Sequence, residues 1–227
     1  MGKQPKDGTW SVPAAPGGAR AEYTDEQRAR ISLLEADLAV QLVTIPKRLK
    51  HSLSVAATAE AMALLYDVDP YLARAAGILH DWDKVVPHAE LVRRAEALGI
   101  QMGVPLTRVE PLLHGIVAAR ELPARYPWLP DEVWHAIAVH TTAAAQMGPL
   151  DMVIFVADGV EPRRPDTPGI RATRELVGKV SLEDLFWESF VGGLTYVLEG
   201  GRYLYPGTLD VYNSLAADRA AKAGRRF

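Results

Sequence analysis

Apolar residues recur every three or four positions along most of the chain, which is the spacing of one face of an α-helix. Thr24 and Gln27 have the spacing of a capping box and predict the start of a helix. The stripe that follows, over residues 25–43, consists of Ile31, Leu34, Leu38 and Leu42. No run alternates apolar and polar residues between Asn-Gly or Asp-Gly turns, as a β-hairpin would. The pattern therefore predicts an all-α fold, a single compact helical bundle.

Helix start signals divide the rest of the chain into further helices. The predicted starts are Pro46, Asp69 with Pro70, Glu90, Thr107 paired with Glu110, Pro130 with Asp131, Leu150, Ser181 paired with Asp184, and Thr208. The helix from Asp69 is expected to end near Leu79, and the helix from Leu150 near Val160. Short connections between these helices favour one domain over residues 23–222.

The first 22 residues differ from this pattern. Residues 1–22 are rich in Gly, Pro, Lys and Ala without hydrophobic periodicity, so they are predicted to form a disordered tail. The start of the chain has no apolar signal region, and the longest mid-chain apolar run, residues 152–157, is far too short to span a bilayer. We therefore expect a cytoplasmic protein with no membrane partner.

The amino-acid composition limits which ligands the protein can bind and which side chains can hold a metal. The 227 residues carry a net charge of −3, which argues against nucleic acid as a partner but allows a small phosphorylated ligand. Hydrophobic residues make up 48%, enough to bury a core. The chain has no cysteine, so a metal site has to use histidine nitrogen and carboxylate oxygen.

Four of the six histidines, with two aspartates, fall at helical positions and form the candidate metal site: His51, His80, Asp81, His114, His140 and Asp158. Six such groups are too many for one metal with an open position and enough for two, with Asp81 as the natural bridge. Two cations at this spacing bind a hydroxide between them and hold the oxygens of an attacked phosphate. The alternative is that these residues are hydrogen-bonded or at the surface, as expected for His88 and His135, or that a salt bridge satisfies Asp158.

Several stretches around these residues resemble one known family. They are Arg48-Leu-Lys-His51-Ser52, Ala76-Gly-Ile-Leu-His80-Asp81 with Lys84, Leu113-His114-Gly115, Ala136-Ile-Ala-Val-His140-Thr141, Ala157-Asp158 with Glu161-Pro162-Arg163, and Tyr212-Asn213. The pattern resembles the HD-domain metal-dependent phosphohydrolases, and within them the YqeK-type symmetrical bis(5′-nucleosyl)-tetraphosphatases. The resemblance spans about residues 43 to 215. It departs after Thr142, where an alanine run replaces the usual glycine.

The resemblance implies a helical fold and hydrolysis of diadenosine tetraphosphate to two ADP. It also implies two divalent metal ions as cofactors, with iron expected and manganese or cobalt as alternatives. One metal would be held by His51, His80, Asp81 and Asp158, and the other by Asp81, His114 and His140. Asp81 and Lys84 are the predicted catalytic residues.

The predicted substrate contacts are Lys84, Thr141 and Arg163, because cations and hydroxyls suit phosphate. Lys84 and Arg163 are alternatively solvated surface charges. The small-molecule partner is expected to be a nucleotide. Two other functions stay open: an HD phosphohydrolase acting on a nucleoside monophosphate or a guanosine alarmone, and a catalytically inactive nucleotide-binding regulator. A homodimer is also left open.

Overall fold

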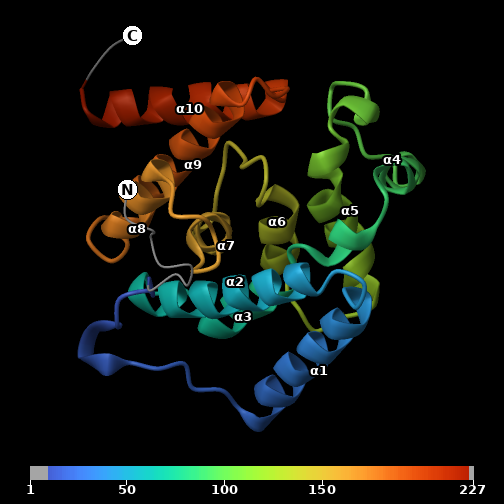
Figure 1. Ribbon diagram of the computed structural model, residues 1–227. Helices are drawn as coiled ribbons and strands as arrows, with labels where there is room; N and C mark the ends of the chain where they lie inside the picture. Colours follow the sequence, from blue (N-terminus) through green and yellow to red (C-terminus); the bar gives the residue numbers. More distant parts are fainter. Residues whose placement is uncertain (1–9, 225–227) are drawn as a thin grey trace, which may run out of the picture.

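The structure is a computed structural model that describes residues 10–224, and it confirms the all-α fold (Figure 1). Within these residues there is no β-strand. The helices are α1 (Asp25–Gln41), α2 (Pro46–Leu65), α3 (Pro70–Leu79), α4 (His88–Ala97), α5 (Leu113–Glu121), α6 (Asp131–Val139), α7 (Pro149–Val160), α8 (Pro168–Leu176), α9 (Leu182–Glu199) and α10 (Pro206–Lys222). Short 3₁₀ turns cover Pro16–Gly18, Trp82–Val85, Leu106–Arg108, Glu110–Leu112 and Leu122–Ala124.

The centre of the fold is the contact between α2 and α3, which lie side by side (Figure 1). Gly77 of α3 permits this approach, because a Cβ there would lie 2.6 Å from Cα of Ala56 on α2. Helix α7 packs against both of them and against α6. Its Val153, Ile154 and Val156 are fully buried. Burial of these side chains fixes the relative positions of α2, α3 and α7.

Several predicted helix starts are confirmed, because they depend on local hydrogen bonds. Thr24 and Gln27 form the reciprocal capping box of α1. Asp69 caps α3 by accepting from two backbone N–H groups, and Pro70 occupies the first turn. Ser181 accepts from the backbone N–H of Asp184 at the start of α9. Each cap satisfies donors that would otherwise lack a partner.

The predicted start at Thr107 is wrong. Thr107 lies inside one 3₁₀ turn, Glu110 begins a second, and α5 begins only at Leu113 without a side-chain cap. Pro111 explains the difference, because it has no N–H to continue a helix from Thr107 and its ring clashes with the preceding turn. Helix α8 was not predicted, although Thr167 caps it and Pro168 follows, as Asp69 and Pro70 do for α3.

The described part of the N-terminal segment lies against the helical body. The guanidinium of Arg174 on α8 lies 5.1 Å from the ring centroid of Trp10, and Ala15 is buried. The predicted disordered tail, residues 1–22, therefore includes a part that contacts the body. Its residues 1–9 lie outside the described residues. Between residues 10 and 224, no helix combines the length and apolar content needed to cross a membrane.

Candidate metal centre

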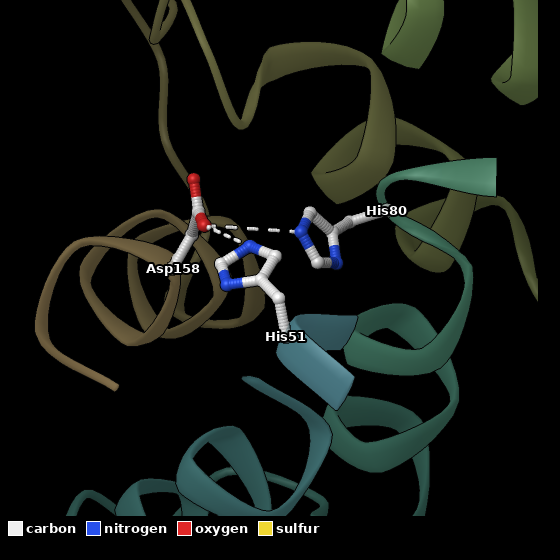
Figure 2. A group of neighbouring side chains, drawn as sticks. All are labelled: His51, His80 and Asp158. Atoms are coloured by element: carbon white, nitrogen blue, oxygen red, sulfur yellow. Dashed lines mark ion pairs between the residues drawn. The ribbon is translucent and has the colours of Figure 1, made fainter. Parts of the chain in front are cut away.

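The structure brings all six residues of the candidate metal site together at one place. They come from α2 (His51), the end of α3 (His80) and the residue after it (Asp81), the start of α5 (His114), the end of α6 (His140), and α7 (Asp158). Figure 2 shows His51, His80 and Asp158 pointing toward one another. The site is thus built from segments far apart in the sequence, positioned by the packing of α2, α3 and α7.

Asp81 lies between two pairs of histidines, and each of its oxygens faces one pair. Its Oδ1 lies 3.0 Å from Nε2 of His114 and 3.9 Å from Nε2 of His140. Its Oδ2 lies 3.4 Å from Nε2 of His80 and 3.6 Å from Nε2 of His51. A carboxylate in this position can contribute one oxygen to each of two neighbouring cations.

Asp158 joins only one of the two pairs. Its Oδ1 lies 2.9 Å from Nε2 of His51 and 3.8 Å from Nε2 of His80. Two groups of three have ligand atoms within 4.8 Å of one another: His51, His80 and Asp158, and His80, Asp81 and His140. These two groups share His80, and the carboxylate of Asp81 lies within 3.9 Å of Nε2 of all four histidines.

The other ring nitrogen of each histidine is engaged away from the centre. In three of the rings, Nδ1 contacts the backbone carbonyl oxygen of the residue three positions earlier. The distances are 2.8 Å from His80 to Gly77, 3.0 Å from His114 to Pro111, and 2.7 Å from His140 to Ile137. A carbonyl only accepts, so these Nδ1 atoms carry the proton and donate. Each Nε2 is then left with a lone pair facing the centre, which is how metal-binding histidines are oriented.

Glu161 orients His51 and was missing from the sequence prediction of the site. Nδ1 of His51 lies 3.0 Å from Oε1 of Glu161, which is only 1% exposed. Arg174 holds the same loop, because its guanidinium donates to the carbonyls of Val160 at 2.9 Å and Glu161 at 2.7 Å. The sequence did offer one signal for Glu161, because this residue lies in a stretch that carries the family resemblance. An isolated glutamate is normally a surface residue, however, so its role at the site was not predicted.

The protonation properties of the site suit cations. Burial, with His114 and His80 acting in the same direction, lowers the pKa of His140 to about 3, so this ring is neutral, as a ligand has to be. Burial alone would raise the pKa of Asp81, but His80 and His114 lower it well below the usual range. Burial alone would lower the pKa of His51, but the carboxylates of Asp158 and Glu161 raise it above the usual value. The carboxylates thus attract positive charge to this place.

The donor set fits divalent metal ions such as iron, manganese or zinc. Nε2 of His51 and Nε2 of His80 are buried and have no hydrogen-bond partner of adequate geometry within residues 10–224. Buried polar atoms without partners are costly, and a bound cation would remove this cost. Four imidazole nitrogens and two carboxylates are a borderline set that these metals accept.

Three cationic side chains surround the two carboxylates. Arg48 contacts Oδ2 of Asp81 at 2.6 Å, and Arg164 forms an ion pair with Asp158. Nζ of Lys84 lies 3.3 Å from the ring nitrogens of His114 and 3.9 Å from Oδ1 of Asp81. Burial lowers the pKa of Lys84. Lys84 therefore lies beside the centre, and so do Arg48 and Arg164.

The other two predicted substrate residues differ in position. Thr141 lines a cavity that also touches His140 and Asp158, and its Oγ1 is buried and has no hydrogen-bond partner among the described residues. Arg163 is exposed, and its backbone N–H donates to Glu161, whereas the neighbouring Arg164 reaches the centre.

The two remaining histidines lie outside the centre. His88 contacts Glu110 at 3.4 Å, and Nδ1 of His135 lies 2.8 Å from Asp151. Both side chains are at least half exposed. Their partners are single carboxylates, so neither position gathers a set of metal ligands.

Comparison with known proteins agrees with this geometry. The family model described as HD domain matches residues 48–163, which include all six residues. The symmetrical bis(5′-nucleosyl)-tetraphosphatase of Staphylococcus aureus is 33% identical over 74% of this chain and 86% of its own. The enzyme of the same name from Halalkalibacterium halodurans is 31% identical over 76% of this chain and 90% of its own.

A solved structure shows the same fold. It is the crystal structure of a predicted HD superfamily hydrolase involved in NAD metabolism from Clostridium acetobutylicum, with a TM-score of 0.73 and 29% identity. The match covers 81% of this chain and 97% of that one. The family match, the relatives and the clustered histidines and aspartates lead to one conclusion: the chain is a hydrolase of the HD domain family.

Proposed function

We propose that this protein hydrolyses dinucleoside tetraphosphates symmetrically, converting diadenosine tetraphosphate to two ADP with two divalent metal ions. The observation that carries the proposal is Asp81, whose two oxygens face two separate histidine pairs. His51, His80, Asp81 and Asp158 would hold one ion, and Asp81, His114 and His140 the other. Two such ions supply a nucleophile from water and hold the phosphoryl oxygens of the substrate.

The residues around the centre have distinct parts in this proposal. Glu161 and the backbone carbonyls fix the histidine rings, so that little reorganisation is needed when the ions bind. Lys84 carries positive charge beside Asp81 and is placed to stabilise the charge that develops on the leaving phosphate. Thr141 would contact substrate from the adjoining cavity, and Arg163, which is exposed and outside the lining of that cavity, is kept as a proposed contact.

The position of the positive charge supports symmetrical cleavage. Arg48 and Arg164 pair with two different carboxylates of the centre, and Lys84 lies beside it. Charge on several sides of the centre favours a polyphosphate bound by its middle, with phosphates extending both ways. The names of the relatives from Staphylococcus aureus and Halalkalibacterium halodurans support the same substrate class.

The test is product analysis over a panel of metals and nucleotides. Metal-stripped protein is loaded with iron, manganese, cobalt or magnesium and given diadenosine tetraphosphate, and an early time point is separated by chromatography. We expect ADP as the sole nucleotide product, and GDP alone from the guanosine analogue. Equal amounts of AMP and ATP would contradict symmetrical cleavage. Faster turnover of a nucleoside monophosphate or a guanosine alarmone would favour another HD phosphohydrolase, and no cleavage with any metal would favour a regulator.

A further inference from the structure

A cavity of about 420 Å³ opens beside the metal centre, between α7, α8 and α9. His140 and Asp158 belong to its lining, so the cavity and the candidate metal centre are continuous. Its volume lies in the range of about 300–1,000 Å³ that is typical of small-molecule sites. The space is therefore suited to a ligand that reaches the centre with one end.

Two consecutive glycines in α9 line this cavity, and nothing in the described chain requires them. Gly192 and Gly193 lie in the interior of the helix, where glycine is among the least favourable residues. A Cβ added at either position would meet no described atom within 4 Å beyond its chain neighbours and the nearby backbone of its own helix. Close packing within the chain therefore does not explain the missing side chains, whereas a ligand lying against the helix would.

The lining of the cavity combines two kinds of surface. Arg164 pairs with Asp158 of the centre, and Thr141 next to His140 has a buried Oγ1 without a hydrogen-bond partner among the described residues. Phe155 and Tyr196 line the cavity as well, together with the glycines. Tyr196 is 63% exposed, which is high for a large aromatic side chain. Positive charge beside the centre, with aromatic and bare backbone surface in the same cavity, matches a nucleotide.

We propose that this cavity binds the nucleoside of one half of the substrate, with the base lying against Gly192 and Gly193 and the phosphates directed to the centre past Arg164. The inference rests on the proposed function for the identity of the whole substrate. The binding site itself requires only a ligand that carries a nucleoside and a phosphate chain, so ADP is a suitable probe.

The experiment uses the full-length, metal-loaded protein and three leucine variants. Gly192→Leu and Gly193→Leu fill the cavity side of α9, and Thr195→Leu is the matched control, on the same helix but outside the lining. We expect the two glycine variants to raise the Kd for ADP and the KM for diadenosine tetraphosphate at least tenfold. The Kd for inorganic pyrophosphate, which has no nucleoside, should stay within twofold of wild type. Thr195→Leu should change none of these values more than twofold.

Folding is measured separately by thermal melting. Leucine favours a helix over glycine, and the space around each Cβ is open, so neither glycine variant should melt below wild type. For a glycine variant that does melt lower, the alanine variant at the same position is measured instead, with a smaller rise in the Kd for ADP expected.

ADP binding within twofold of wild type in both leucine variants would overturn the proposed site. Equal losses of ADP and pyrophosphate affinity would also overturn it, since they would indicate damage to the centre rather than to a nucleoside site. The proposed function fails differently, through wild-type protein that cleaves no dinucleoside tetraphosphate. In that case the ADP and pyrophosphate constants still decide whether the cavity binds a nucleoside.

Discussion

Replacing Gly115 with alanine should damage one half of the metal centre while leaving the helices folded. Gly115 follows His114 on α5, at the contact with the end of α6. A Cβ there would lie 2.5 Å from the carbonyl oxygen of Ile137, and 2.7 Å and 2.8 Å from Cε1 and Nδ1 of His140. The added methyl would therefore press on His140 and on the carbonyl that orients its ring.

The size of the effect follows from these distances. Favourable contacts between carbon atoms lie at about 3.5–4.0 Å. The His140 ring or the end of α6 therefore has to move by several tenths of an ångström at least. Metal–ligand distances tolerate only about 0.2 Å, so metal affinity at the His114 and His140 side should fall about 10–100-fold. Overpacking should cost about 1–3 kcal/mol, which for a chain of this size lowers the melting temperature by roughly 2–12 °C.

Calorimetric titration of metal-stripped protein with manganese, beside thermal melting, measures both quantities. Leu34→Ala is the control, because Leu34 is fully buried in α1 and its truncation should cost about 2–5 kcal/mol. That variant should lose stability and keep the metal affinity of wild type. Wild-type affinity and turnover in Gly115→Ala would refute the idea that the approach of α5 to His140 sets the centre.

Three further predictions concern the support of the centre, its metals and the N-terminal segment. Glu161→Gln should lower metal affinity about 10–100-fold with little change in helix content, which metal titration and circular dichroism measure, because a neutral amide holds His51 more weakly. Manganese, iron or cobalt at 100 times its Kd should stabilise the stripped protein by about 2.7 kcal/mol for each bound ion and restore activity, whereas magnesium should do so poorly; melting and turnover check this. Trp10→Ala should destabilise the protein by about 0.5–2 kcal/mol in a denaturant titration and leave turnover unchanged, because Arg174 keeps its hydrogen bonds to the carbonyls of Val160 and Glu161 without the Trp10 ring.

Features that depend on neighbouring residues were accessible from the sequence. The caps at Thr24 and Asp69 are local hydrogen bonds, so their spacing predicted where α1 and α3 begin. The wrong helix start at Thr107 also has a local cause, because Pro111 prevents a helix from continuing past the capping-box spacing. The missed start of α8 at Thr167 shows that even a local signal is weak when the following helix is short and buries only two of its nine residues.

Features that depend on packing were not accessible in the same way. The sequence named the six residues that the structure brings together, because four histidines and two aspartates at helical positions stand out, and two of them follow apolar runs. Glu161 belongs to one of the matched stretches, but its contact with His51, 110 positions earlier in the chain, depends on how α2 and α7 pack. The division of Asp81 between two histidine pairs also depends on close approaches between helices, such as that of Gly77 to Ala56.

The most direct test of the dinuclear centre is an anomalous difference map of a crystal of the protein loaded with manganese or iron, measured at the absorption edge of that metal. The account predicts two peaks per chain. One should lie among His51, His80, Asp81 and Asp158, and the other among Asp81, His114 and His140, with Asp81 contacting both. A single peak, or peaks that do not contact Asp81, would contradict it.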